Sequence, residues 1–342
     1  MKKLLFLLIL FLPFNALAYG SSAKSAILMD MDSHRIIYGK DINYVQSVAS
    51  ISKVMTAICV IENTDIEKTI TVGDEVLKAY GSGIYVQIDE KLKIKDLLYG
   101  LMMRSGNDAA LVLAKNTSGD ISKFVNLMNN KALKIGMKNT TFNNPSGLDE
   151  QDDGNLSSAY DMALLMSYAM KNKDFKKIVS TKSYTLKTNK NVYKWKNKNK
   201  LLYSYKYITG GKTGYTKIAK RTLVTTASKD GLNLVAVTIN DSNDWEDHIN
   251  LFEEAFNNYY NYNLIKKGNI SIIGENYYRN NKLYIKNKVS YPLTLDEENI
   301  IKIKYELYKK RKYKNNDNVG KVKLFLGDSV VREENIYVRV KS

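Results

Sequence analysis

The sequence predicts an α+β domain, in which helices flank an antiparallel sheet, followed by a small all-β domain of the sandwich type. In the first part, strand patterns stand at both ends of a long mixed stretch, and such first and last elements commonly share one antiparallel sheet. In the last part, apolar residues recur at every second position in short stretches separated by Asn, Gly and Asp turns. The 342 residues are enough for two domains with ample buried apolar area.

The elements expected in the first domain follow from the spacing of its apolar residues. Helices are expected over residues 50–62, 96–103, 108–115, 124–136 and 158–170, and from Trp245 to Tyr259. Strands are expected over residues 25–32, 36–41, 183–186, 193–195, 208–216, 221–227 and 232–240. Asn144-Pro145-Ser146-Gly147 is a turn signal, and Lys229-Asp230-Gly231 predicts a hairpin between the last two strands.

The polar stretch 257–263 marks a domain boundary. Beyond it Ile301, Ile303 and Tyr305 alternate with polar residues, and Val322, Leu324 and Leu326 repeat the pattern. We therefore expect one domain over residues 19–262 and an all-β domain over residues 263–342.

Residues 1–18 have the pattern of an export signal. Lys2 and Lys3 precede the apolar run 4–12, and Ala16-Leu17-Ala18 is a small-x-small cleavage site. The run is too short for a membrane-spanning helix, which needs roughly 20 apolar residues. We expect a mature chain starting near Tyr19 in the cell envelope: at the outer face of the cytoplasmic membrane, in the periplasm or secreted. No C-terminal membrane anchor is expected either.

Composition narrows the function classes further. The formal net charge is +17, but no nucleic-acid-binding module accompanies the basic stretches 187–200 and 309–314, so these are interpreted as solvated surface and nucleic acid is not an expected partner. For an exported protein, peripheral contact with the membrane or with anionic wall polymers is left open. Cys59 is the only cysteine, so no internal disulfide can form.

The first of three short strings is Ser50-Ile51-Ser52-Lys53. Ser50 and Lys53 are three positions apart at the start of a predicted helix and so share a face. A lysine can take the proton of a serine hydroxyl only if it is neutral, and its pKa must fall from ~10.4 to near 8 for about one lysine in ten to be neutral at pH 7. Burial and a second cation, for which Lys212 is the candidate, would lower it. A second copy, Ser21-Ser22-Ala23-Lys24, precedes a strand and is set aside.

The second string is Ser105-Gly106-Asn107, in a tight break between two predicted helices. Taken alone, it favours ordinary helix-cap chemistry over a role in proton relay and substrate binding. The third string, Lys212-Thr213-Gly214, lies in a predicted strand and offers a cation and a hydroxyl to a carboxylate. It is not a phosphate-binding loop, which needs glycine where this chain has Lys206.

Two other site types are not expected. His34 falls in a turn and His248 in the last helix of the first domain, so both are interpreted as structural and no histidine triad is assembled. No spacing of histidines or cysteines indicates a metal site, and no cofactor is expected.

Taken together and in this order, the three strings form the signature of serine acyl-transfer enzymes that use no histidine. The chain resembles the serine D-Ala-D-Ala carboxypeptidases, low-molecular-mass penicillin-binding proteins with a serine β-lactamase/transpeptidase-like domain and a C-terminal β-sandwich. Besides the strings, the resemblance rests on DLLYGLMMRSGNDAALVLA (96–114), NPSGL (144–148), ITGGKTGYT (208–216), the helix from Trp245 and the all-β tail.

The resemblance implies roles for these residues. Ser50 would attack the carbonyl between the two terminal D-alanines of a peptidoglycan stem peptide, with Lys53 as its base. It further implies that Ser105 and Lys212 pass a proton to the departing D-alanine and that Asn107 holds the substrate. Lys212 and Thr213 would bind the terminal carboxylate beside Gly214, and the N–H groups of Ser50 and Tyr215 would form the oxyanion hole. β-Lactam antibiotics would acylate Ser50 as inhibitors.

Two departures and two alternatives accompany this interpretation. Many relatives have histidine where this chain has Ser146 and glycine where it has Lys220. The substrate preference near Lys220 and Arg221 is therefore in question. A serine β-lactamase shares the fold and the strings, but no Glu-x-x-Leu-Asn pattern for its deacylating glutamate stands between Asn107 and Lys212. A catalytically idle wall-binding scaffold is the second alternative, and the partner of the β domain stays unknown.

Overall fold

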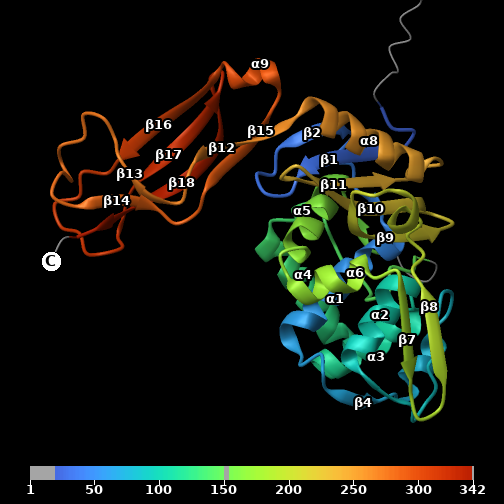
Figure 1. Cartoon of the computed structure of the whole chain (residues 1–342). Helices are drawn as coiled ribbons and strands as arrows, with labels where there is room; N and C mark the ends of the chain where they lie inside the picture. Colours follow the sequence, from blue (N-terminus) through green and yellow to red (C-terminus); the bar gives the residue numbers. More distant parts are fainter. Residues whose placement is uncertain (1–19, 150–153, 341–342) are drawn as a thin grey trace, which may run out of the picture.

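The computed structural model describes residues 20–149 and 154–340. The N-terminal domain holds a five-stranded antiparallel sheet, β2-β1-β11-β10-β9, so that its first and last strands share one sheet as predicted (Figure 1). The strands of this sheet are β1 (Ser25–Asp30), β2 (Ile36–Lys40), β9 (Ile208–Thr216), β10 (Lys220–Lys229) and β11 (Leu232–Ile239). The expected export signal at residues 1–18 lies outside the described residues.

Helices cover both faces of this sheet. The helices of this domain are α1 (Lys53–Asn63), α2 (Ile94–Arg104), α3 (Asn107–Ser118), α4 (Ile121–Ile135), α5 (Ala159–Ala169), α6 (Lys173–Ser180), α7 (Leu201–Ser204) and α8 (Asp244–Asn258), with the 3₁₀ turns η1 (Ala49–Ser52) and η2 (Asp74–Lys78). Of these, α5 and α8 contact the central strands of the sheet from opposite faces. Five of the six helices expected from apolar spacing are confirmed within a few residues. The sixth, predicted over 50–62, divides into η1 and α1, so Ser50 lies in a tight turn instead of a regular helix.

Short strand pairs complete the domain. They are β3 (Gln46–Ser47) with β6 (Leu156–Ser157), β4 (Thr69–Thr71) with β5 (Lys91–Lys93), and the predicted basic hairpin of β7 (Ser183–Lys187) and β8 (Val192–Lys196). Helices α6 and α7 and the first two of these pairs were not predicted, because segments of two to eight residues carry too little periodicity.

Strand β1 shows why the sheet can be covered on both sides. All six of its residues are buried, and neighbouring residues on a strand point to opposite faces. Ile27 and Met29 pack into the larger core with α1 and α5, whereas Leu28 packs into the smaller one against Leu251 and Phe252 of α8. Cys59 of α1 is fully buried in the larger core, as expected.

His248 of α8 is buried and neutral, as a structural role requires. Its ring nitrogens lie 2.6 Å from Thr225 Oγ1 and 3.2 Å from Thr238 Oγ1, and burial lowers the pKa of His248 to about 3. A group whose folded-state pKa is lowered contributes stability above its unfolded pKa, near 6.5, and this stability is lost as the pH falls toward 3.

We therefore expect the melting temperature of the protein to fall as the pH is lowered from 6.5 to 3. The melting temperature of the His248→Asn variant is expected to fall less over this window than that of the parent chain. Differential scanning calorimetry at successive pH values measures both. An equal loss in the two proteins would show that protonation of His248 does not drive the acid sensitivity.

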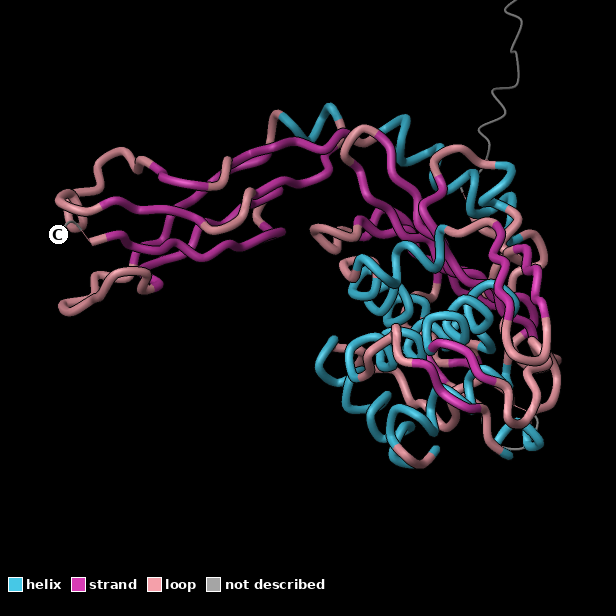
Figure 2. The backbone as a smooth tube through the Cα atoms, turned by 60° about the horizontal axis from the view of Figure 1, so that its bottom comes forward, coloured by secondary structure: helices cyan, strands magenta, loops and turns pink. Residues whose placement is uncertain are grey.

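The C-terminal domain is rich in strands, as predicted. It combines the pair β12 (Tyr260–Ile265) and β15 (Val289–Leu293) with a five-stranded sheet in the order β13-β14-β18-β17-β16 (Figure 2). The strands of that sheet are β13 (Gly268–Ile270), β14 (Lys282–Ile285), β16 (Ile301–Leu307), β17 (Asn318–Leu326) and β18 (Ser329–Arg339), and α9 (Leu295–Glu298) follows β15. Within the described residues, no helix combines the length and apolar content needed to cross a membrane.

Two arginines join the domains. Arg35, between β1 and β2, donates to the Pro292 carbonyl at 2.6 Å and forms a two-pronged ion pair with Glu297 at 2.6 and 2.8 Å. Arg332 of β18 donates to the carbonyl oxygens of Asp32 at 3.3 Å and Ser290 at 3.1 Å. The β domain is thus attached to the N-terminal domain at one end, and its opposite end projects away (Figure 1).

Candidate active site

Ser50 is presented by a strained turn. Ala49, immediately before it, has φ of +49°, a left-handed conformation that residues with side chains rarely adopt. Such strain persists only where the surroundings enforce it. Here Ser52 Oγ donates to the Ala49 carbonyl at 2.8 Å, and Gly147 packs so closely that a Cβ on it would lie 2.2 Å from the same oxygen. The predicted turn around Gly147 therefore helps to lock the Ser50 turn.

Lys53 begins α1 and turns its amine toward Ser50. Its Nζ lies 3.0 Å from Ser50 Oγ and 2.7 Å from Asn107 Oδ1, and it also donates to the Ser146 carbonyl. The side chain is 0% exposed. A fully buried amine with three oxygen neighbours is held in one position, within hydrogen-bond reach of the hydroxyl whose proton it would take.

The burial of Lys53 favours its neutral form, which is the form that can act as a base. Burial is the main cause that lowers the pKa of Lys53 to about 7, and the charge of Lys198 lowers it further, while Asp108 acts in the opposite direction. About half of the Lys53 amines are then neutral at pH 7. The expected second cation is thus Lys198 and not Lys212, because Lys212 is itself fully buried and its own pKa is lowered by burial and by Lys53.

The second lysine forms a similar pair with the second serine. Ser105, in the break between α2 and α3, has φ of +66°, and its Oγ accepts from Lys212 Nζ at 3.0 Å. Lys212, on β9, is 1% exposed and also donates to the Thr213 carbonyl. Residues 107 positions apart in the chain therefore form a second buried amine–hydroxyl pair next to the first.

Asn107 links the site to the loop that follows η2. Its backbone N–H donates to the Ser82 carbonyl at 2.7 Å, and its Nδ2 donates to the Tyr80 carbonyl at 2.6 Å. Asp108 fixes the next part of this loop by accepting from the N–H groups of Ile84 at 3.0 Å and Tyr85 at 2.6 Å. The helix-cap interpretation of Asn107 is therefore incomplete, because its side chain bridges this loop and Lys53.

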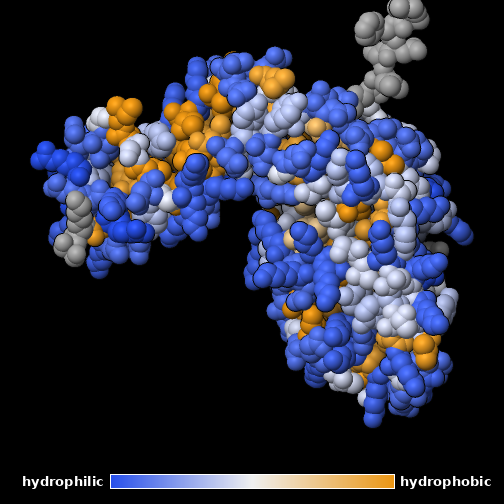
Figure 3. Space-filling model, in the orientation of Figure 1, coloured by the Kyte–Doolittle hydropathy of each residue, from blue (hydrophilic) through white to orange (hydrophobic). Residues whose placement is uncertain are grey.

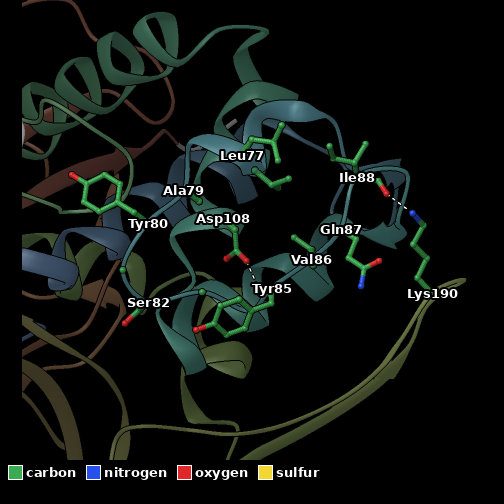
Figure 4. Close-up of a pocket in the computed structure, with 13 residues that line it drawn as sticks. Leu77, Ala79, Tyr80, Ser82, Tyr85, Val86, Gln87, Ile88, Asp108 and Lys190 are labelled. Carbon is green, nitrogen blue, oxygen red and sulfur yellow. Dashed lines mark hydrogen bonds between the residues drawn. The ribbon is translucent and has the colours of Figure 1, made fainter.

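A pocket of about 520 Å³ lies along this loop, and its lining residues are drawn in Figure 4. Tyr80, Ser82 and Asp108 line it, and Lys190 donates to the Ile88 carbonyl at its rim. None of Ser50, Lys53, Ser105 and Lys212 lines this pocket. Its loop supports Asn107 from behind, so the pocket lies beside the catalytic groups without containing them.

The catalytic groups open into a different pocket, of about 420 Å³. It is lined by Ser50, Ser82, Ser105, Lys198, Lys200, Thr213, Gly214, Tyr215, Arg221, Asp244 and Trp245. Strand β9 is the edge of its sheet, so Thr213 and Tyr215 border the pocket with no further strand beyond them. The lining residues that the structure describes include three basic residues, Lys198, Lys200 and Arg221, and no glutamate.

The close packing of β9 requires glycine at position 214. A Cβ at this position would lie 2.4 Å from Thr222 Oγ1 and 2.9 Å from the backbone nitrogen of Ser50. Glycine therefore lets β9 pass directly beside the Ser50 turn. This approach brings the strand next to the backbone N–H of Ser50, one of the two expected oxyanion donors.

The structure brings the sequence-predicted residues to one site. Lys53 hydrogen-bonds to Ser50 and Asn107, and Lys212 hydrogen-bonds to Ser105. One pocket is lined by Ser50, Ser105, Thr213, Gly214 and Tyr215. Sequence reasoning missed several of their neighbours, which are Ser82, Lys198, Lys200, Asp244, Trp245 and the Ser146 carbonyl. Only Ser146 and Trp245 had a signal, because the resemblance draws on the NPSGL string and on the helix from Trp245. The others come from elements whose proximity no local pattern reveals.

The remaining candidates lie elsewhere. Ser21 donates to Asp247 at 2.7 Å and Lys24 to Tyr44 at 3.0 Å, so the second Ser-x-x-Lys string forms no pair of its own. His34 lies in the turn before β2. Within residues 20–149 and 154–340, no group of three or more His, Cys, Asp or Glu side chains is arranged to hold a metal ion.

The geometry is that of a serine acyl-transfer site in which an amine, and no imidazole, faces the nucleophile. Comparison with known proteins agrees. A family described as D-alanyl-D-alanine carboxypeptidase matches residues 14–243, and the C-terminal domain of penicillin-binding protein 5 matches residues 259–341. The chain belongs to the D-alanyl-D-alanine carboxypeptidase family.

The individual relatives have moderate sequence identity to this chain. D-alanyl-D-alanine carboxypeptidase DacF of Bacillus subtilis is 35% identical over 255 residues, which cover 72% of this chain and 65% of that protein. DacB2 of Mycobacterium tuberculosis is 33% identical over 62% of this chain and 73% of its own length. The structure of penicillin-binding protein 5 from Haemophilus influenzae superposes with a TM-score of 0.79 at 25% identity, and covers 94% of this chain and 98% of that one.

Proposed function

We propose that the protein is a serine-type D-Ala-D-Ala carboxypeptidase that removes the terminal D-alanine from peptidoglycan stem pentapeptides. The observation that carries the proposal is the buried Lys53 amine, 3.0 Å from Ser50 Oγ and with a pKa of about 7. A neutral amine at this place can accept the hydroxyl proton as the oxygen attacks. The relatives named above carry the same activity in their names.

The reaction then proceeds in two halves. Ser50 Oγ bonds to the carbonyl carbon while its proton passes to Lys53, and the oxygen that becomes negative accepts from the N–H groups of Ser50 and Tyr215. The peptide C–N bond breaks, and the Ser105–Lys212 pair delivers a proton to the departing amine of D-alanine. Water then attacks the ester, gives up a proton to the same basic groups and releases the shortened peptide and the free Ser50 hydroxyl.

Binding uses the rim of the same pocket. The Lys212 amine and the Thr213 hydroxyl offer hydrogen bonds to the terminal carboxylate, and Asn107 offers its amide to the peptide backbone. A β-lactam resembles the D-Ala-D-Ala end and acylates Ser50 in place of the substrate. The activity belongs to the maturation of the cell wall, and with it to cell shape, after export directed by residues 1–18.

The direct test is mass spectrometry of the protein incubated with penicillin, followed by peptide mapping, together with measurement of D-alanine released from a stem pentapeptide. We expect one adduct per chain, on Ser50, and release of one D-alanine per peptide. Rapid turnover of nitrocefin without a lasting adduct would favour a β-lactamase instead. An unmodified protein that still binds wall fragments would favour a scaffold.

Arg221 gives the proposal a test of substrate preference. It stands opposite Tyr215 on β10, pairs with Asp244 and lies over the ring of Trp245, 5.8 Å from its centroid. The guanidinium is held at the pocket by these partners while the side chain stays 43% exposed. It therefore adds positive charge where the terminal carboxylate of the substrate would approach.

We expect Arg221→Gln to raise KM for the pentapeptide about tenfold, in line with the loss of one charge-assisted contact, and to change kcat little. Steady-state kinetics of D-alanine release measure both. Lys220→Gln is the matched control, because it removes a neighbouring exposed charge that does not line the pocket. Equal changes in the two variants would mean that only the overall charge near the pocket matters.

A further inference from the structure

The pocket of about 520 Å³ along the loop that follows η2 takes no part in the reaction proposed above. It adjoins the active-site pocket, because Ser82 lines both. Asn107, whose amide would hold the peptide backbone of the substrate, binds the same loop through the carbonyl oxygens of Tyr80 and Ser82. A substrate that extends past Asn107, away from Ser50, would therefore reach this second pocket.

Tyr85 presents an aromatic ring at this pocket. Its N–H donates to the buried Asp108 at 2.6 Å, and its carbonyl accepts from Tyr193 OH at 3.3 Å, so the backbone is fixed on both sides. The φ angle of Tyr85 is +62°, a conformation that costs a bulky residue free energy. The side chain is nevertheless 77% exposed. A strained backbone that holds a ring in solvent indicates a contact surface for a ligand, because the ring contributes little to the packing of the chain itself.

Other apolar side chains border the same pocket. Figure 4 shows Tyr85 at one side of it and Leu77 and Ile88 at the other. Leu77 is 75% exposed and Ile88 is 37% exposed. The space-filling view shows patches of apolar surface near this end of the N-terminal domain, where the β7–β8 hairpin turns (Figure 3). Apolar walls around a hollow of this volume are typical of a small-molecule or sugar site.

The charged side chains at the pocket are already engaged. Among the lining residues that the structure describes, these are Asp108, which accepts from backbone N–H groups of the loop, and Lys190, which donates to the Ile88 carbonyl. Gln87 and Ser82 are exposed and offer uncharged hydrogen-bonding groups. The active-site pocket, by contrast, is lined by three basic residues. The ligand of the second pocket is therefore expected to be uncharged, with an apolar face and hydrogen-bonding groups at its edge.

The proposed substrate contains a group of this chemistry. A stem peptide is joined through its N-terminus to a glycan strand of N-acetylated sugars. Each sugar ring has faces of C–H groups, which can pack on an aromatic ring, and a rim of hydroxyl and acetamide groups. Four residues separate the scissile carbonyl from the sugar, and an extended chain of that length spans about 13 Å. Because packed layers of backbone are ~10 Å apart, this chain is long enough to pass one loop.

From these observations we infer that the pocket bordered by Tyr85, Leu77 and Ile88 binds the glycan part of the substrate, with the sugar next to the stem peptide packed on the Tyr85 ring. The inference rests on the proposed function, because it extends the same substrate beyond its peptide. A stem peptide attached to glycan would bind through both pockets, whereas a free peptide would bind through one. The second pocket would thus select stems that are part of the wall.

The test compares D-alanine release from a free pentapeptide with release from the same pentapeptide carrying the disaccharide of N-acetylglucosamine and N-acetylmuramic acid. We expect KM to be about fivefold lower for the disaccharide-peptide and kcat to be similar, since contacts far from the reacting bond act on substrate and transition state alike. Equal KM values would overturn the inference. Titration calorimetry of Ser50→Ala with both ligands measures the same preference without turnover, so loss of activity on both substrates would contradict only the proposed function.

Variants of Tyr85 assign the preference to its ring. Tyr85→Ala is expected to remove the advantage of the disaccharide-peptide and to change KM for the free pentapeptide by less than about twofold, whereas Tyr85→Phe keeps the ring and is expected to behave as the parent chain. Tyr44→Ala is the matched control, because Tyr44 is 47% exposed in the same domain and lines neither pocket. An equal rise of KM for both substrates in Tyr85→Ala would overturn the assignment, since the ring would then act on the peptide part.

Discussion

Alanine in place of Ser50 and methionine in place of Lys53 are each expected to lower the rate of D-alanine release by at least about 10³-fold, and the double variant is expected to be no slower than the slower single variant. The reason is that the two groups act as one unit. The hydroxyl is a weak nucleophile without its base, and the base has no proton to take without the hydroxyl.

The chain supplies its own matched control for this experiment. Ser21 and Lys24 repeat the Ser-x-x-Lys spacing but bind Asp247 and Tyr44, away from the pocket. Ser21→Ala and Lys24→Met are therefore expected to keep full activity. If the effects of Ser50→Ala and Lys53→Met multiplied in the double variant, the two residues would be acting independently, and Lys53 would not be the base for Ser50.

The second large effect is in the pH dependence of acylation. With the pKa of Lys53 at about 7, the reactive neutral amine falls from half of the molecules at pH 7 to about one in a hundred at pH 5. The rate constant for acylation by a β-lactam is therefore expected to fall roughly 50-fold between these pH values, and to level off above pH 8. Stopped-flow measurements with a chromogenic β-lactam give the profile.

Replacement of Lys198 is expected to shift the pH profile of acylation. Its charge lowers the pKa of Lys53, so Lys198→Ala is expected to raise the pKa and shift the midpoint toward higher pH. Lys200→Ala is the matched control, because Lys200 also lines the pocket but is not among the charges that act on Lys53. A midpoint that moves equally in both variants, or in neither, would contradict the assignment to the Lys53 amine.

Much of the fold could be predicted because its longer elements carry regular patterns. The alternation in β16 and β17, the Lys229-Asp230-Gly231 hairpin and the helical spacing from Trp245 to Tyr259 each depend on near neighbours in the chain. The division of the first helix into η1 and α1 was not predictable, because it depends on Gly147 packing against Ala49 from a distant part of the sequence.

The sequence by itself determined which groups could react and how two of them are spaced. Ser50 and Lys53 are three positions apart whatever surrounds them, and the order of the three strings indicated the family. Only the tertiary structure decided that the Lys53 amine is buried, that Ser105 meets Lys212, and that Lys198 is the cation that acts on the base. The physical reason is that desolvation and long-range charge interactions depend on everything packed around a group, and a linear pattern does not contain those surroundings.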